Sequence, residues 1–297
     1  MSFSLYLKNK ISKNKINRSD LIAQLNLYHD EFRNLDAITL SRWVNNKTTP
    51  SPYKQALISQ YFGEDIITFI NNHITIKKES KIIKNTFNSI MENIESSYSN
   101  ISYFHSNEEP EYIVNAFDYN SYNSLLSNYY MNFPIYQKMN YIFDINNIKN
   151  DYLCVIKRKN NVISSHISSI KMDEKKSRLL SNLFKTNINS EFFVNLGYIE
   201  NRESYLFMTS LLYYYFYKNN IRTFTCLIRG EFLEFLTLLS YQQIGTTYID
   251  NGRKLYLIQG DFLNVITSPF VLRNFNALLS RSNNNLDDFF TTKLINS

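Results

Sequence analysis

The sequence is poor in the residues that build cross-links and metal clusters. It has 297 residues but only two cysteines, Cys154 and Cys226, and each lies in an apolar run typical of a strand. Because the two are far apart in the sequence, we expect buried free thiols rather than a disulfide. The histidines have no Cys, Asp or Glu neighbours at the spacing of metal ligands, so we expect no metal site.

Long apolar runs are also absent. The longest, Tyr205–Tyr217, is shorter and more polar than the ~20-residue span that a membrane helix needs. Residues 1–15 have no apolar core followed by a small-residue cleavage site, so they do not indicate a secretion signal. We therefore expect a cytoplasmic protein that does not associate with a membrane. The scarcity of glycine, with six in the chain, indicates a coding bias towards Asn, Lys, Ile and Tyr and nothing about function.

Positive charge is concentrated in the first third of the chain. Residues 1–85 contain 13 Lys and Arg against 7 Asp and Glu, whereas the rest contains 19 of each kind. This distribution is typical of a small module that meets phosphates, attached to a neutral body. The length also favours two domains, because domains of roughly 100–200 residues are usual.

The apolar periodicity of residues 3–70 predicts helices throughout. We expect Ser19 to cap the second helix and Asp36 the third, with Pro52 at the start of a fourth. A longer amphipathic helix is predicted at 83–94. We interpret it as a connecting helix, with a dimerisation helix as the alternative, because its apolar stripe needs a partner.

The segment Thr39–Ser51, TLSRWVNNKTTPS, resembles the helix-turn-helix of phage-repressor (Xre/Cro-type) regulators, in which such a run on the recognition helix precedes a polar turn, a proline and another helix. A helix of this kind fits the major groove of DNA, where hydroxyl and guanidinium groups reach base edges. The resemblance places Leu40 and Trp43 in the core. It implies that the DNA contacts come from Arg18, Ser19, Asp36, Thr39, Ser41, Arg42, Asn45, Asn46 and Lys47.

Residues 25–36 make the turn before this helix longer than is usual in that family. A five-helix bundle that binds another protein is the alternative to a DNA reader. If the DNA reading holds, the partner is double-stranded DNA, and readers of this type commonly bind it as homodimers.

From residue 111 onwards, strand and helix patterns alternate. Strands are predicted at 111–118, 191–199 and 222–229, and hairpins at 151–170 and 246–260. Helices are predicted at 119–134, 203–219 and 230–245, the last of them ended by Gly245.

This order resembles the GNAT acyltransferase superfamily over about 111–262. Residues 188–258, with EFFVNL as the central strand, look most like acyl-homoserine lactone synthases. In that fold a strand-to-helix turn holds the pyrophosphate of an acyl carrier, because glycines let backbone amides approach it. Arg202 matches the cationic position of this turn, whereas Tyr205 and Phe207 occupy the positions where the family has small residues.

The other catalytic positions of those synthases are mostly missing. Ile188 and Glu191 stand where the family has an acid and an arginine, and only Asp144, in YIFD, matches an acidic position. Glu200, Glu203 and Tyr241 are candidates for acid–base work, although such residues are more often surface or core residues. His166 is more simply a packed histidine.

We therefore predict an α+β protein with two domains. Residues 1–75 form an all-α helix-turn-helix bundle, 76–110 a linker, and 111–297 a GNAT-like mixed α/β domain. The favoured function is a sequence-specific DNA-binding transcriptional regulator whose degenerate acyltransferase-like domain senses a ligand or mediates dimerisation. An active N-acyltransferase with a DNA-binding head is the alternative, and a purely structural or protein-binding module is a third reading.

No cofactor is certain. The resemblance allows acyl-CoA or another acylated small molecule as a ligand, in a cleft that is concave and mostly apolar. The expected lining residues are Asp144, Phe192, Tyr198, Arg202, Phe207 and Met208.

Overall fold

The computed structural model describes residues 2–74, 78, 80–99, 109–281 and 286–291. The chain divides into two compact units. The N-terminal unit comprises Met1–Lys78 and Ile266–Leu272, and the sheet unit comprises Glu79–Val265 and Arg273–Ser297. Within the described ranges, no helix is long and apolar enough to cross a membrane. The same ranges contain no group of His, Cys, Asp and Glu that could hold a metal ion.

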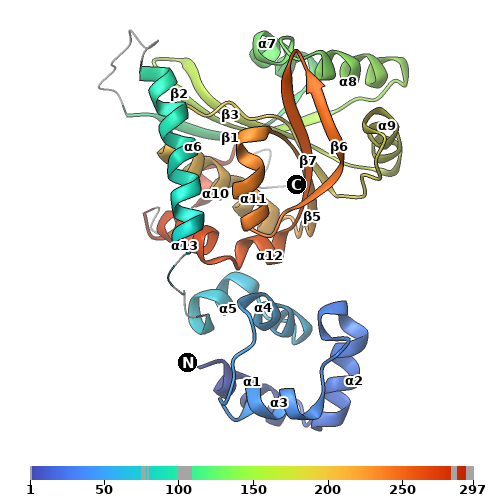
Figure 1. Cartoon of the computed structure of the whole chain (residues 1–297), viewed down its shortest axis with the longest axis vertical. Coiled ribbons are helices and arrows are strands. Elements are labelled where there is room, and N and C mark those ends of the chain that lie inside the picture. The colour runs from blue at the N-terminus through green and yellow to red at the C-terminus, as the bar shows by residue number, and fades with distance from the viewer. Residues whose placement is uncertain (1, 75–77, 79, 100–108, 282–285, 292–297) are drawn as a thin grey trace. The chain divides into compact units, whose positions relative to one another are not determined.

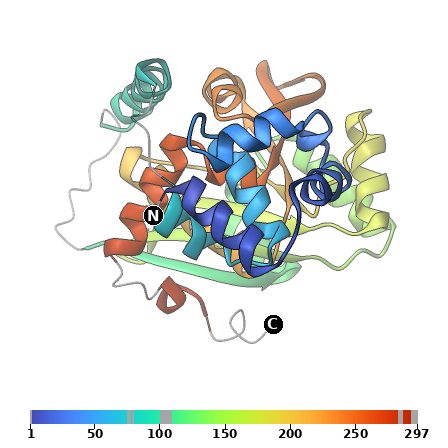
Figure 2. The same ribbon diagram turned by 90° about the horizontal axis from the view of Figure 1, so that it is seen from below.

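The N-terminal unit contains a cluster of short helices, drawn in blue in both ribbon views (Figures 1 and 2). Their apolar faces meet in a core that includes the fully buried Leu7, Leu21, Leu25, Leu40 and Phe69. The helices are α1 (Phe3–Lys13), α2 (Arg18–Tyr28), η1 (Asp30–Phe32), α3 (Ala37–Val44), α4 (Pro52–Tyr61) and α5 (Ile66–His73).

Side-chain caps fix where these helices begin. Asp36 caps α3 as expected, since its carboxylate accepts a hydrogen bond from the backbone N–H of Thr39 at 2.6 Å. Pro52 is the first residue of α4, after the cap Ser51. The expectation for Ser19 was wrong, because α2 is capped two residues earlier by Asn17. Asparagine and serine cap equally well, so the sequence alone does not choose between them.

The sheet unit is built on seven strands in the order β1-β2-β3-β4-β5-β7-β6. Every neighbouring pair is antiparallel except β4 and β5, which run parallel. The strands are β1 (Glu111–Asp118), β2 (Asp151–Lys159), β3 (Val162–Lys171), β4 (Phe192–Val194), β5 (Thr223–Arg229), β6 (Gln242–Asp250) and β7 (Arg253–Asp261).

Both predicted hairpins are present, and each turns on residues that accept a left-handed backbone. Asn160 and Asn161 join β2 to β3 with φ of 50° and 62°. Asn251 and Gly252 join β6 to β7 with φ of 48° and 74°. Two consecutive positive φ values match the twist of a two-residue hairpin, and Asn and Gly tolerate them best.

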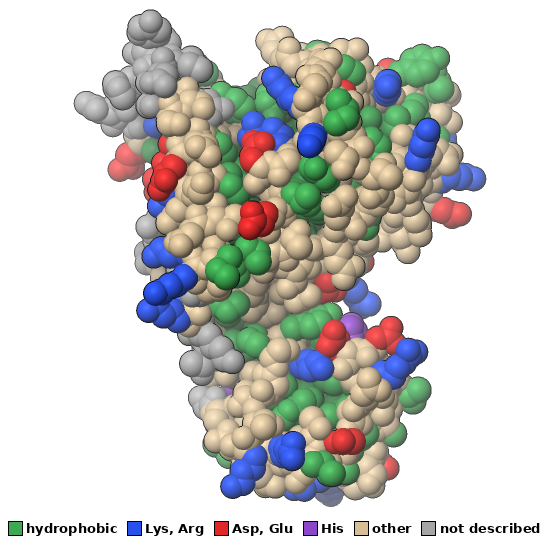
Figure 3. Space-filling model, viewed as in Figure 1, with side chains coloured by type: hydrophobic (Ala, Val, Ile, Leu, Met, Phe, Trp, Pro, Cys, Tyr) green, Lys and Arg blue, Asp and Glu red, His purple; other side chains and the backbone are tan. Residues whose placement is uncertain are grey.

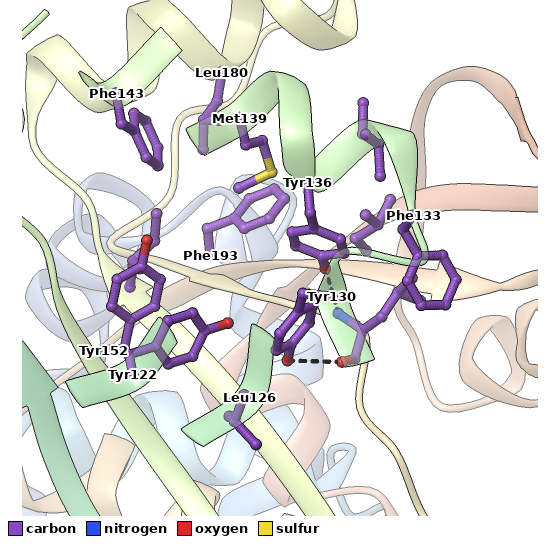
Figure 4. Packing of buried hydrophobic residues seen from close by; sticks show 14 of the residues in the cluster. Tyr122, Leu126, Tyr130, Phe133, Tyr136, Met139, Phe143, Tyr152, Leu180 and Phe193 are labelled. Carbon is purple, nitrogen blue, oxygen red and sulfur yellow. Dashed lines mark hydrogen bonds between the residues drawn. The ribbon is translucent and has the colours of Figure 1, made fainter. Parts of the chain in front are cut away.

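Helices cover both faces of the sheet (Figure 1). One face packs against α7 (Tyr119–Tyr130), α8 (Pro134–Ile145) and α9 (Glu174–Phe184), where aromatic rings fill a large core (Figure 4). The opposite face carries α10 (Arg202–Lys218) and α11 (Leu233–Leu238), and α6 (Lys81–Ser99) lies beside α11. The remaining elements are η2 (Gly230–Phe232), α12 (Phe262–Ile266), α13 (Pro269–Arg281) and η3 (Leu286–Phe289).

The apolar stripe of α6 is buried within its own chain. Phe87 packs against Tyr205 of α10 and Phe235 of α11, with tilted rings whose centroids are 5.3 and 5.1 Å apart. Ile90, Met91 and Ile94 are buried as well. The stripe that suggested dimerisation is therefore covered by helices of the sheet unit.

Some elements differ from the sequence-based prediction. The helix expected to end at Gly245 ends at Leu238, and Gly245 lies in β6, where the pairing with β7 shifts its register. A side chain there would meet Thr186 at 2.8 Å, so close approach of the backbone, with a φ of 69°, requires glycine. The helices α9 and α13 were not predicted.

Candidate functional site

The parallel strands β4 and β5 separate at the centre of the sheet. They pair over Phe192–Val194 and Phe224–Cys226. Beyond Val194, the chain stays beside β3: the N–H of Asn195 donates to the carbonyl of Ser168 at 2.8 Å, and Tyr198 exchanges two backbone hydrogen bonds with His166. Because β5 continues along β7, the two strands open into a fork.

Three tyrosine hydroxyls hold the fork open. Tyr136 accepts a hydrogen bond from the N–H of Leu196 at 2.6 Å, and Tyr130 donates to the carbonyl of the same residue at 3.0 Å (Figure 4). Tyr129 donates to the carbonyl of Gly197 at 3.0 Å. Buried backbone groups must be paired, and these hydroxyls supply the partners that a neighbouring strand would otherwise give.

A cavity of about 110 Å³ lies at the fork. Its walls come from both strands, from α10 and from α11, and they are largely apolar. Representative wall residues are Val194, Ile199, Leu212, Phe224 and Leu236. A concave, mostly apolar space of this kind is the usual form of a small-molecule site.

Polar side chains also line this cavity: Tyr205, Tyr213, Tyr241 and Cys226, together with Asn195, Thr209 and Arg229. The hydroxyls of Tyr213 and Tyr241 form a hydrogen bond of 2.7 Å. Burial raises the pKa of all three phenols and of the thiol, and for Tyr205 and Tyr241 the neighbouring Tyr213 and Cys226 raise the pKa further. The three phenols and the thiol are therefore protonated and neutral at physiological pH.

The start of α10 lies close to the cavity, and its N–H groups are occupied by side chains of the same chain. The carboxylate of Glu95, on α6, accepts a hydrogen bond from the N–H of Arg202 at 2.8 Å. Asn201 accepts one from the N–H of Ser204 at 2.9 Å. A helix N-terminus attracts anions, and here a carboxylate already satisfies that preference.

A buried ion pair lies behind this turn. Lys157 of β2 is 3% exposed and pairs with the carboxylate of Glu200, while its ammonium also donates to the hydroxyl of Ser204 at 2.8 Å. The N–H of Glu200 donates to the hydroxyl of Ser165 at 3.1 Å. Glu200, a candidate for acid–base work from the sequence, is therefore engaged in holding the turn.

The bulky residues of this turn are packed against aromatic rings. Tyr205 stacks on Phe232 with the ring centroids 5.8 Å apart, and Phe207 contacts Tyr112 and Phe289 at 4.2 and 5.4 Å. The first turn of α10 thus packs as part of the core. No glycine is present there to let an extended phosphate group approach the backbone.

The six expected lining residues do not meet in one pocket, and none of them lines the fork cavity. Arg202 and Phe207 line a separate open cavity of about 630 Å³, together with Glu95 and Glu203. Phe192 and Met208 are buried in the core. Asp144 is exposed at the end of α8, and Tyr198 lies beside His166, with their ring centroids 6.1 Å apart.

The nine residues implied in DNA contact lie in the N-terminal unit, and seven of them are exposed. Thr39 and Ser41 are half-buried, while Arg42 is exposed on the side of α3 opposite the buried Leu40 and Trp43. Asp36 is occupied as the cap of α3. The exposed residues are Arg18, Ser19, Asp36, Arg42, Asn45, Asn46 and Lys47.

Two expectations from the sequence concern buried groups. Both cysteines are free thiols, as predicted, but only Cys154 is buried, since Cys226 is half-buried. His166 is packed, as predicted, between Tyr129 and Tyr198 and beside Tyr130. Burial lowers the pKa of His166 to about 3, so its ring is neutral at pH 7.

The sequence analysis missed Tyr205, Tyr213 and Cys226 as members of one cavity. Their spacing gave one signal: Tyr205 and Tyr213 are eight residues apart on α10, which places them on the same side of a helix. Tyr241 and Cys226 come from other elements, so only the fold brings all four together.

Solved structures of two acyl-transferring proteins are similar to the C-terminal part of the chain. One is BjaI, a CoA-dependent acyl-homoserine lactone synthase with SAM and isopentyl-CoA, at 6% identity and a TM-score of 0.34, covering 47% of this chain and 67% of that one. The other is FeeM, an N-acyl amino acid synthase from uncultured soil microbes, at 9% identity and a TM-score of 0.36, covering 54% and 96%. No family model and no curated protein matches the sequence. The likeness is weak, so the function must be derived from the chain's own residues.

Proposed function

We propose that this protein is a sequence-specific DNA-binding regulator whose sheet unit holds an apolar, acyl-type ligand at the fork between β4 and β5. The observation that supports this most is the pairing of an apolar cavity with a closed helix N-terminus. An acyl group fits the former, whereas at the latter Glu95 and Asn201 already accept the hydrogen bonds of the Arg202 and Ser204 N–H groups that a pyrophosphate would need.

The electrostatics at the start of α10 also disfavour a nucleotide carrier. Arg202 is the one cation among the residues lining the larger cavity, and it shares that cavity with the carboxylates of Glu95 and Glu203. A pyrophosphate would have to displace Glu95 and then lie beside Glu203. A ligand without phosphates avoids both costs.

The N-terminal unit supports the DNA-binding part of the proposal. Its helix α3 buries Leu40 and Trp43 and leaves Arg42 in solvent, the division that a helix entering the major groove requires. Lys and Arg side chains are spread over the face of this unit seen in Figure 3, with Asp and Glu among them. Arg18 and Lys47, both exposed, are suited to phosphates.

The test of DNA binding uses the full chain and a preferred duplex selected from random sequence. We expect Arg42→Ala to weaken binding to that duplex by ~1–3 kcal/mol, and raising the salt to weaken it steeply. Arg178→Ala, which removes an exposed arginine from α9 of the sheet unit, is the matched control and leaves the affinity unchanged. Equal affinities for Arg42→Ala and the original chain would overturn the DNA pose.

The proposal includes binding of two copies of the chain to one DNA site as a homodimer. Since the stripe of α6 is covered by α10 and α11, the two copies would have to meet through another surface. Sedimentation of the full chain, with and without its selected duplex, measures whether two copies assemble on one site.

Acyl transfer is the second candidate, and the hydroxyls in the fork cavity are the observation that favours it. Neutral donors aimed at a carbonyl oxygen stabilise the oxyanion that forms when an amine attacks an acyl group. This reading predicts release of free thiol from acyl-CoA or an acyl carrier in the presence of amines, with slower release by Tyr241→Phe. Absence of thiol release, together with ligand binding, supports the regulator.

A further inference from the structure

The outward face of α3 carries a large apolar side chain. Ile38 is 64% exposed, whereas Leu40 and Trp43, on the opposite face of the helix, are buried. Residues four and three positions apart lie on the same side of a helix, so Ile38, Arg42 and Asn45 share the outward face. We call these three residues the reading face.

The position of Ile38, rather than its exposure alone, is informative. Single apolar residues are common on protein surfaces. Isoleucine is also a weaker helix former than alanine, because its branched side chain is stiff, so it does not favour the helix itself. Ile38 lies one turn before Arg42, on the helix face that the proposed function places in the major groove. A partner that covers the reading face therefore covers this apolar surface as well.

The charges around the reading face favour DNA as that partner. Residues 37–50 contain Arg42 and Lys47 and neither Asp nor Glu. The carboxylate of Asp36, which immediately precedes them, is held at the start of α3 by the N–H of Thr39. In duplex DNA the phosphates flank the base edges of the major groove. An apolar side chain accompanied by cations fits this arrangement.

One base has an apolar group in the major groove. Thymine presents its 5-methyl group there, and apolar side chains recognise it by contact. Packing Ile38 against this methyl group removes apolar surface of both from water. Four residues of an α-helix span about 6 Å, and successive base pairs lie about 3.4 Å apart. Ile38 and Arg42 consequently reach base pairs that are about one or two steps apart.

We propose that Ile38 determines specificity by packing against the methyl group of a thymine, about one or two base pairs from the base that Arg42 contacts. This inference rests on the proposed DNA-binding function of the N-terminal unit. It adds a contact residue that the resemblance to phage-repressor regulators does not imply, and it names the base that this residue recognises.

Uracil provides a direct test, because it differs from thymine only by lacking the 5-methyl group. The full chain is used with the preferred duplex selected from random sequence. Each thymine of that duplex is replaced in turn by deoxyuridine, and the affinity for every duplex is measured. At the thymine that Ile38 contacts, we expect the affinity of the original chain to fall by about 3- to 5-fold, the value of one buried methyl group.

Ile38→Ala should abolish this discrimination, so that the thymine and deoxyuridine duplexes bind the variant equally. The ratio of the two affinities cancels any general effect of the substitution on binding. Because Ile38 is exposed and alanine is the better helix former, the variant should keep its fold. Ile145→Ala is the matched control, since Ile145 is 59% exposed on α8 of the sheet unit. This control should keep the ratio of the original chain.

The outcomes separate this inference from the function on which it rests. If the original chain prefers one duplex but no deoxyuridine substitution weakens binding, recognition of a thymine methyl group is refuted while DNA binding stands. If Ile38→Ala discriminates thymine from deoxyuridine as well as the original chain does, another residue reads the methyl group and the role of Ile38 is refuted. If the original chain has no preference among duplexes, the regulator function itself fails, and the protein-binding alternative for the helical bundle stands.

Discussion

The carboxylate of Glu95 on α6 accepts a hydrogen bond from the backbone N–H of Arg202, the first residue of α10. The two residues are 107 positions apart in the sequence. A helix N-terminus has unpaired amides and a partial positive charge, so a carboxylate placed there is stabilising. The chain thus supplies its own anion at the N-terminus of α10.

Removing this carboxylate should loosen the start of α10. We expect Glu95→Ala to destabilise the sheet unit by about 0.5–2 kcal/mol, the range for loss of a capping side chain. Hydrogen exchange of the first turn of α10 should accelerate at the same time. Glu92→Ala, which removes an exposed carboxylate from the same helix, is the control and should change neither quantity. Equal exchange in both variants would contradict a capping role for Glu95.

Removing one partner of the ion pair between Lys157 and Glu200 should lower the free energy of unfolding of the sheet unit. Lys157→Met leaves the carboxylate of Glu200, which is 19% exposed, without its cation. We expect a loss of about 3–5 kcal/mol, because a largely buried negative charge then has no opposite charge beside it and keeps only the hydrogen bond from the Asn201 amide. The double variant Lys157→Met/Glu200→Leu should lose less than Lys157→Met alone.

The loss of stability caused by Lys157→Met must be measured with a signal that comes from the sheet unit. The single tryptophan, Trp43, lies in the N-terminal unit, so its fluorescence does not report on the sheet unit. Near-ultraviolet circular dichroism of the tyrosines, recorded against urea, follows the sheet unit instead. A double variant that is less stable than Lys157→Met would count against the ion pair as the cause.

The stability of the sheet unit should depend on pH through His166. Its folded pKa, about 3, lies below the ordinary value of 6.5, so the unfolded chain binds a proton that the folded chain does not. Stability is therefore greatest above pH 6.5 and falls as the pH drops towards 3. Between pH 7.5 and pH 5 we expect His166 to contribute a loss of about 2 kcal/mol.

His166→Phe keeps a ring among the tyrosines and removes the titrating group. Urea unfolding at the two pH values, followed by tyrosine circular dichroism, should show a smaller pH effect in this variant than in the original chain. The same difference between the two pH values in both proteins would show that other groups set the pH dependence.

Local patterns predicted several elements because local chemistry builds them. Asp36 caps α3 whatever lies around it, and Asn251-Gly252 accepts the two positive φ values of a tight hairpin. The same approach failed after Val194. There the run EFFVNLGYI has strand character throughout, yet only Phe192–Val194 pairs with β5. The split depends on the hydroxyls of Tyr129, Tyr130 and Tyr136, and no property of the run itself reveals them.

The candidate site was likewise predicted only in part from the sequence. From the sequence, Arg202, Tyr205 and Phe207 were interpreted as a phosphate turn without its glycines, and this interpretation stays a prediction. The side chains that hold this turn could not be predicted from the sequence. Glu95 and Lys157 reach this turn from α6 and β2, and whether a turn is open or closed depends on such long-range contacts.

The sequence by itself determined the helical character of residues 3–70, the two hairpins, the free thiols and the bulky residues at the start of α10. These features depend on side-chain size, backbone preference and spacing within a few residues. Only the tertiary structure decided that α6 is packed against its own chain, that a carboxylate closes the helix N-terminus, and that three phenols and a thiol share one cavity. Those features depend on which distant segments meet, and burial then sets the protonation of each group.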